Sequence, residues 1–310
     1  MNKSMPSSIA SSLKPGLIAY GVVCGALFVY NVRWRFAANL IFGAKPKTLP
    51  ILKESPDDDK KKKKPIIVLL HGMWHDAVWY SKLQKMLKEK GYYSYAIELL
   101  PGERALPGFS QQEIVQDLEA TLLDNEEYIL LGHSQGGLVA QSVLKNSPKL
   151  EAKTKATVLL GTYPLGLMPP AKKLFSQQRN MYNHIGYAGI CLIGKVISLD
   201  YLKHIFLSPS TDVHKEELKE YTKKILSAPS DGRITMSHFP QSVGLLSTKP
   251  ALVLGAKDDI IYPPHMLKKD FDERFPNATH KVIPNQGHCF MDGGTEMEEA
   301  LIAWLDTITD

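Results

Sequence analysis

Residues 128–137 read YILLGHSQGG, and this stretch decides the fold of the chain. Residues 128–131 have the length and apolar composition of a buried strand, and residues 135–145 have the pattern of a helix. Between them stands Gly132-His133-Ser134-Gln135-Gly136. A sharp turn from strand to helix pushes the central serine hydroxyl out of the sheet, and glycine on both sides lets the turn close without side-chain clashes. The stretch therefore predicts that Ser134 is presented for chemistry.

The segments around this stretch alternate between strand and helix patterns. Short apolar runs predict the strands, and apolar residues at helical spacing predict the helices. The expected strands are residues 66–70, 92–99, 128–131, 156–160, 251–254 and 280–283, and the expected helices are residues 78–90, 110–124, 135–145, 263–275 and 296–305. This alternation is typical of the α/β class, in which helices cover both faces of a mostly parallel sheet of about six core strands.

Candidate partners for the serine follow two of the later strands. A serine hydroxyl is a poor nucleophile alone and requires a base that is held by an acid. Asp258 and Asp259 come just after the strand at 251–254, and His288 comes just after the strand at 280–283. Because functional groups of parallel sheets gather at the carboxyl ends of the strands, these residues and Ser134 are expected at one edge. The order Ser, Asp, His is that of a hydrolase with a nucleophile elbow.

Together these motifs resemble the α/β-hydrolase superfamily, and more narrowly its lid-bearing members of the lipase and esterase type. The resemblance extends from Pro65 to the C-terminus. It rests on four motifs: His71-Gly72, the GHSQG turn, the GAKDD loop of residues 255–259, and Gly287-His288.

The resemblance implies a role for each matching residue. Ser134 is expected to be the nucleophile and His288 the base, and the backbone N–H groups of Met73 and Gln135 are expected to form the oxyanion hole. Neither a cofactor nor a metal ion is expected. Trp74, His133 and Cys289 flank these positions and are expected to contact the substrate.

The acid and the strand count depart from the family pattern. Two aspartates are adjacent, and the distance from Gly255 favours Asp258, whereas the distance to Pro263 favours Asp259. Asp258 is preferred and Asp259 stays as the alternative. The family's first two antiparallel strands have little room upstream of Pro65, so six core strands are expected rather than eight.

Residues 162–245 interrupt the alternation with several helical stretches and many apolar or aromatic residues. Their place, between a core strand and the strand before the acid, predicts a helical lid that walls a substrate pocket.

The N-terminal part has a different composition from the remainder. Residues 1–64 hold 12 Lys/Arg and 4 Asp/Glu, whereas the remainder holds 25 and 28. The basic charge therefore lies outside the folded body, which argues against a nucleic-acid-binding domain. Three scattered cysteines exclude a disulfide framework and a zinc cluster.

An apolar segment at residues 17–32, followed by Arg33, Trp34 and Arg35, predicts a single-pass membrane anchor with the body in the cytosol. A secretory or organelle presequence remains the alternative. The expected organisation is an anchor or targeting segment at 1–53, a charged linker at 54–64 and the hydrolase domain at 65–310.

These features predict a membrane-associated serine hydrolase that cleaves a lipophilic carboxylic ester, with a small molecule or lipid as substrate. A thioesterase or acyltransferase would use the same three residues. A non-catalytic ligand-binding protein of this fold is the alternative outside the enzymes.

Overall fold

The computed structural model describes residues 48–56, 64–73, 75–99, 111–122, 126–166, 206–208, 243–266, 268–290 and 295–309. They all belong to one compact unit of the chain. Residues 17–32 and most of the expected lid at 162–245 lie outside the described residues.

The described residues form one seven-stranded sheet with the strand order β1-β3-β2-β4-β5-β6-β7. Every neighbouring pair is parallel except β1 with β3. The strands are β1 (Ile51–Glu54), β2 (Ile66–Leu70), β3 (Ser94–Ile97), β4 (Tyr128–His133), β5 (Thr154–Leu160), β6 (Ala251–Ala256) and β7 (Ala278–Ile283). The α/β-hydrolase fold predicted from the sequence is confirmed, and all six expected strands are present.

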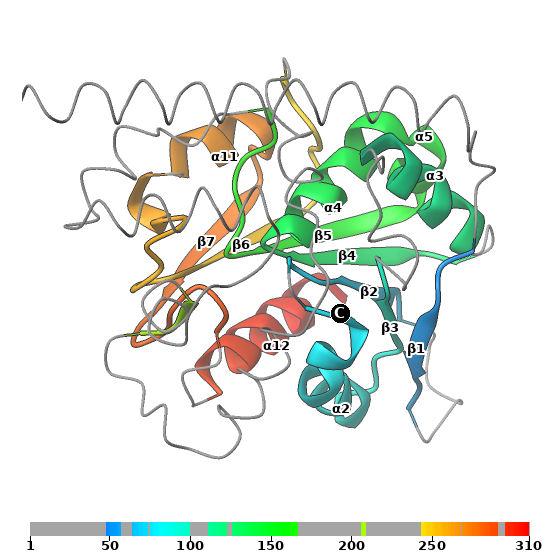
Figure 1. The fold of residues 1–310 in the computed structure, drawn as a ribbon, viewed down its shortest axis with the longest axis horizontal. Coiled ribbons are helices and arrows are strands. Elements are labelled where there is room, and N and C mark those ends of the chain that lie inside the picture. The colour runs from blue at the N-terminus through cyan, green and yellow to red at the C-terminus, as the bar shows by residue number, and fades with distance from the viewer. Residues whose placement is uncertain are drawn as a thin grey trace, which may run out of the picture. The chain divides into compact units, whose positions relative to one another are not determined.

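Helices cover both faces of the sheet (Figure 1). On one face lie α2 (Ser81–Glu89) and α12 (Glu296–Thr309), and on the other lie α3 (Gln111–Thr121), α4 (Gln135–Asn146), α5 (Pro148–Lys153) and α11 (Lys268–Arg274). Two short 3-10 helices, η1 (Ala77–Tyr80) and η3 (Pro264–Met266), precede α2 and α11.

The central strands separate two hydrophobic cores. Every residue of β2 and β4 is buried, which explains the apolar runs at residues 66–70 and 128–131. Side chains of β2 alternate between the cores: Val68 packs with residues of α3 and α4, whereas Leu69 packs with residues of α2 and α12. This two-sided packing fixes the register of β4, and hence the position at which its carboxyl end presents the serine turn.

The seventh strand, β1, was not expected from the sequence. It lies in residues assigned to the N-terminal segment and the linker, so the sheet begins before Pro65. Its pairing with β3 is reinforced by Glu98 N–H, which donates to Pro50 O at 3.0 Å, and by Gln84, whose amide donates to Leu52 O at 2.9 Å. As a half-exposed edge strand, β1 lacks the continuous apolar run that marks the central strands.

The predicted membrane location requires a correction. Across the stretches that the structure describes, no helix combines the length and the apolar character needed to cross a membrane. Residues 17–32, on which the prediction of an anchor was based, are outside those stretches.

Candidate active site

The serine turn connects β4 to α4 with unusual backbone geometry. Ser134 has φ 50° and ψ −116°, a conformation that costs a non-glycine residue about 1–3 kcal/mol and persists only where the surroundings enforce it. Close packing of the backbone around the turn maintains this conformation of Ser134. A Cβ atom on Gly136 would lie 2.0 Å from Leu70 O, and one on Gly132 would lie 2.3 Å from Gly136 O. Glycine at both positions is therefore a steric requirement of the turn.

The structure brings Ser134 together with His288 and one aspartate. His288 Nε2 lies 2.9 Å from Ser134 Oγ, and His288 Nδ1 lies 2.8 Å from Asp259 Oδ2. His288 and Asp259 are both buried. With Nδ1–H donating to the carboxylate, Nε2 carries a lone pair that faces the serine hydroxyl. This arrangement can remove the proton from Ser134 as the oxygen attacks an electrophile.

The acid next to His288 is Asp259, which corrects the preference for Asp258. Asp259 follows directly after the turn that ends β6, and its Oδ1 accepts hydrogen bonds from Ile261 N at 2.8 Å and Tyr262 N at 2.9 Å. These two bonds aim Oδ2 at the imidazole. Asp258 points elsewhere, because its Oδ2 accepts a 2.5 Å hydrogen bond from Ser208 Oγ.

The loop that carries His288 is held from several elements. Asn285 and Phe290, near its two ends, both have φ 53°. Asp258 N–H donates to Gln286 O at 3.0 Å, and Cys289 N–H donates to Phe206 O at 3.1 Å. These contacts place the histidine loop against both the acid loop and residues 206–208.

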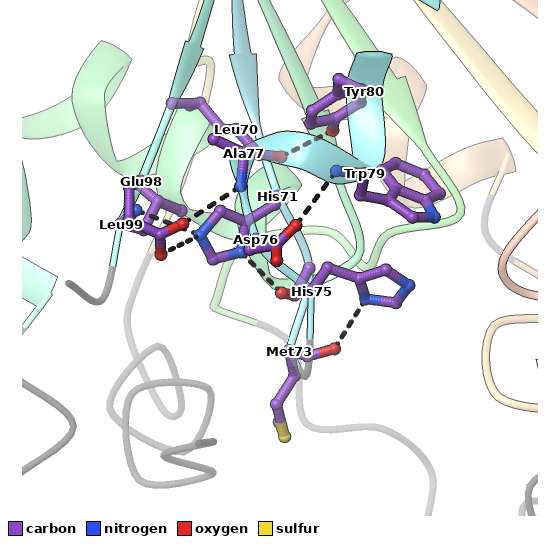
Figure 2. A network of polar contacts seen from close by, with 11 residues as sticks. Leu70, His71, Met73, His75, Asp76, Ala77, Trp79, Tyr80, Glu98 and Leu99 are labelled. Carbon is purple, nitrogen blue, oxygen red and sulfur yellow. Dashed lines mark hydrogen bonds and ion pairs between the residues drawn. The ribbon is translucent and has the colours of Figure 1, made fainter. Parts of the chain in front are cut away.

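A second network fixes the loop after β2, which contains the expected oxyanion residue (Figure 2). Leu99 N–H donates to His71 Nε2 at 3.0 Å, so His71 Nδ1–H donates to Gly72 O at 2.9 Å. The same Nε2 atom lies 3.1 Å from Glu98 Oε1, and Glu98 Oε2 accepts from Ala77 N at 3.1 Å. Glu98 therefore contacts the loop at both of its ends. The sequence interpretation missed Glu98, whose signal was an acidic residue at the carboxyl end of a predicted parallel strand.

Met73 lies at the tip of this loop, and its carbonyl is turned toward His75, whose Nδ1–H donates to Met73 O at 2.8 Å (Figure 2). Gln135 is the first residue of α4, where backbone N–H groups and the helix dipole favour negative charge. Trp74 lies outside the described residues.

His133 and Cys289 differ from the expectation that they contact substrate. Both side chains are completely buried. The His133 ring stacks on Trp79 with centroids 4.7 Å apart, and Cys289 packs within the core on the α3 and α4 face. Neither side chain therefore has exposed surface in this structure.

Burial keeps two histidines beside the site neutral. Desolvation lowers the pKa of His75 to about 3, against a hydrogen bond to the Met73 carbonyl that raises it. Desolvation, followed by the repulsion that protonated forms of His288 and His75 would exert, holds the pKa of His133 well below its usual range. No group of three or more His, Cys, Asp or Glu side chains among the described residues is placed to hold a metal ion.

Comparison with known families agrees with the observed fold. The model of the Alpha/beta hydrolase family matches residues 67–304. The chain belongs to this family. No curated protein sequence shows significant similarity to it.

Solved structures of the same fold include proteins described as a bromoperoxidase, an esterase and a lipase. BpoC from Mycobacterium tuberculosis H37Rv has a TM-score of 0.65 and 20% identity, covering 86% of this chain and 98% of its own. A thermophilic esterase from Thermogutta terrifontis has a TM-score of 0.63 and 21% identity, covering 84% of this chain and 95% of its own. A monoacylglycerol lipase from Paleococcus ferrophilus has a TM-score of 0.59 and 20% identity, covering 84% of this chain and 99% of its own. At these identities the likeness establishes the fold.

Proposed function

We propose that the protein is a serine hydrolase that cleaves a lipophilic carboxylic ester through an acyl-enzyme intermediate. Ser134 is the nucleophile, His288 the general base and Asp259 the acid that orients it. The observation that carries this proposal is the chain of hydrogen bonds through His288, whose Nε2 lies 2.9 Å from Ser134 Oγ and whose Nδ1 lies 2.8 Å from Asp259 Oδ2. Three residues from separate loops meet in this order at the carboxyl ends of parallel strands, where α/β proteins bind their ligands.

The first half-reaction forms the acyl-enzyme. As Ser134 Oγ attacks the ester carbonyl carbon, His288 Nε2 takes the hydroxyl proton. The buried carboxylate of Asp259 stabilises the imidazolium that results. Collapse of the tetrahedral intermediate breaks the bond to the alcohol oxygen, which leaves with the proton from His288. Water, activated by the same imidazole, then attacks the acyl carbon and releases the acid.

The developing oxyanion needs hydrogen-bond donors. We assign this role to the backbone N–H groups of Gln135 and Met73, each worth roughly 3 kcal/mol in the transition state. Support for Gln135 comes from its place at the start of α4. Support for Met73 comes from the hydrogen bonds of His71, Glu98 and His75, which hold the loop that carries it.

A lipophilic substrate is supported by the rings that face the catalytic histidine. The ring centroids of Tyr262 and Phe206 lie 5.4 and 5.8 Å from that of His288. An apolar surround of this kind excludes water from the acyl group and strengthens the electrostatic contacts of the reaction.

The proposal is tested with p-nitrophenyl esters of increasing chain length, using the full chain and two serine variants. Ser134→Ala is expected to abolish turnover. Ser142→Ala is the matched control, since Ser142 is a buried serine on α4 whose hydroxyl donates within the helix, to Leu138 O at 2.7 Å. Turnover that survives in Ser134→Ala would refute the assigned nucleophile.

Two outcomes separate the alternatives. Folded protein that reacts with a fluorophosphonate at Ser134 but turns over only thioesters, or transfers the acyl group to an alcohol, would keep the nucleophile and change the reaction. Folded protein that neither reacts nor turns over any of these substrates would favour a non-catalytic binding protein.

A further inference from the structure

The side chain of His133 connects the two loops that carry the nucleophile and the base. His133 immediately precedes Ser134, and its Nε2–H donates to the backbone carbonyl of His288 at 2.9 Å. The ring is completely buried and lies with its centroid 5.1 Å from that of His288. One side chain thus ties the serine turn to the very residue whose imidazole must reach the serine.

The histidine loop depends on such external contacts. Its positive φ angles at Asn285 and Phe290 are unfavourable for side-chain-bearing residues and require the surroundings to maintain them. The hydrogen bonds already described from other elements to residues 286–289 include two between backbone groups, at Gln286 and Cys289, and two to the imidazole of His288, from Asp259 and Ser134. The bond from the His133 side chain differs from these because it holds the backbone carbonyl of His288.

The surroundings of His133 select one tautomer. Because Nε2–H is the donor, Nδ1 carries the lone pair, and within the described part of the chain this buried atom has no hydrogen-bond partner. A Cβ atom on Gly72 would lie 2.8 Å from Nδ1, so the neighbouring backbone approaches the ring closely. Trp79 stacks against the ring, and His75 meets it edge-on with centroids 5.4 Å apart. The ring is therefore fixed in orientation by packing as well as by its hydrogen bond.

We infer that His133 is a positioning residue, whose neutral imidazole holds the His288 carbonyl and keeps His288 Nε2 within hydrogen-bond distance of Ser134 Oγ. The inference rests on the proposed hydrolase function. A displacement of about 1 Å between reacting groups lowers rates by roughly 100-fold, so a single tether at this place has a large effect on turnover. His133 touches neither the substrate nor the reacting atoms and acts through His288.

The neutral state of His133 also suits the reaction. The titratable groups that face its ring are His75, His288 and, at longer range, His71, and burial together with these groups lowers the pKa of His133. A positive charge on His133 would oppose protonation of His288, which the attack of Ser134 requires.

The test compares three replacements of His133 in the full chain. His133→Phe keeps a ring and removes the donor. His133→Gln keeps an amide N–H near the position of Nε2, whereas His133→Asn is shorter and places its amide near Nδ1. Tyr92→Phe is the matched control, because it removes a buried tyrosine's 2.9 Å hydrogen bond to Thr309 Oγ1, far along the sequence from the catalytic loops.

Two readouts are measured on each variant at a temperature where it is folded. One is kcat and KM on the best ester. The other is the downfield NMR resonance of the His288 Nδ1 proton, which reports the hydrogen bond to Asp259 without requiring turnover.

We expect His133→Phe and His133→Asn to lose about 10- to 100-fold in kcat, with KM changed less than about threefold, and to lose or broaden the NMR resonance. His133→Gln and Tyr92→Phe are expected to retain both. Equal kcat and an intact resonance in His133→Phe and His133→Gln would overturn the inference. If His133→Phe does not fold, His133→Gln and His133→Asn are compared in kcat and in the NMR resonance. Loss of both in His133→Asn alone would support the inference, and equal values in the two variants would overturn it. If the wild type shows no Ser134-dependent turnover, the proposed function fails, and the resonance still decides the role of His133.

Discussion

Exchange of each adjacent aspartate for asparagine separates their roles. In Asp259→Asn, the amide oxygen must occupy the Oδ1 position, because two backbone N–H groups donate to it, from Ile261 at 2.8 Å and Tyr262 at 2.9 Å. The amide nitrogen then faces His288 Nδ1, 2.8 Å away in the native contact. The imidazole must accept at Nδ1 and carry its proton on Nε2, where it cannot take the proton of Ser134.

The expected loss follows from this change of tautomer. Reversal of the tautomer in a serine triad lowers kcat by about 10⁴-fold, which corresponds to about 5.4 kcal/mol in the activation free energy. Asp258→Asn preserves an oxygen that can accept from Ser208 Oγ, and is expected to lower kcat less than about tenfold.

The assay measures kcat for both variants on one p-nitrophenyl ester, together with thermal unfolding to confirm that each is folded. The assignment of Asp259 as the acid is wrong if Asp258→Asn loses as much activity as Asp259→Asn, or if Asp259→Asn stays within about tenfold of the wild type.

Three further predictions concern stability and the loop after β2. Glu98→Ala is expected to lower kcat about tenfold and to lower the free energy of unfolding in urea by about 1–3 kcal/mol, because Ala77 N–H loses its acceptor. Glu98→Gln can still accept from Ala77 N–H and is expected to change kcat and stability little. Equal effects of the two variants would contradict this prediction. Gly136→Ala should cost at least about 3 kcal/mol because its Cβ would meet a β2 carbonyl at 2.0 Å, whereas Gly244→Ala, with open space around it, should be neutral within about 0.5 kcal/mol in the same experiment. Because burial lowers the pKa of His75 from 6.5 to about 3, the unfolded chain binds a proton at His75 between these pH values and the native chain does not. The free energy of unfolding should therefore fall as the pH decreases over this range, by up to about 1.4 kcal/mol per pH unit from this residue. Unfolding of His75→Gln, measured over the same range, should depend less steeply on pH.

The central strands and the serine turn were predictable because their sequence signals are local. The buried run before Gly132 and the two glycines around Ser134 follow directly from packing on both faces of β4 and from the close approach of Gly136 to β2. The edge strand β1 was missed because half of its surface is exposed and its four residues carry no apolar run.

The choice between the two aspartates could not be made from spacing. Asp258 and Asp259 are equivalent in sequence, and their roles diverge only because Oδ1 of Asp259 accepts from two backbone N–H groups that follow it, whereas Asp258 meets Ser208, 50 residues away. The buried position of His133 was missed for the same reason, since its partner at His288 is 155 residues distant. Contacts between distant loops are properties of the folded chain rather than of any one segment.

The nucleophile can be identified directly by the residue that reacts with a fluorophosphonate. The full chain and its Ser134→Ala variant are treated with the reagent, digested and mapped by mass spectrometry. We expect one adduct, on the peptide that contains Ser134, which is absent from the variant and forms much more slowly in Asp259→Asn. An adduct that persists in Ser134→Ala, or a folded wild-type protein that forms none, would contradict a serine nucleophile activated by His288.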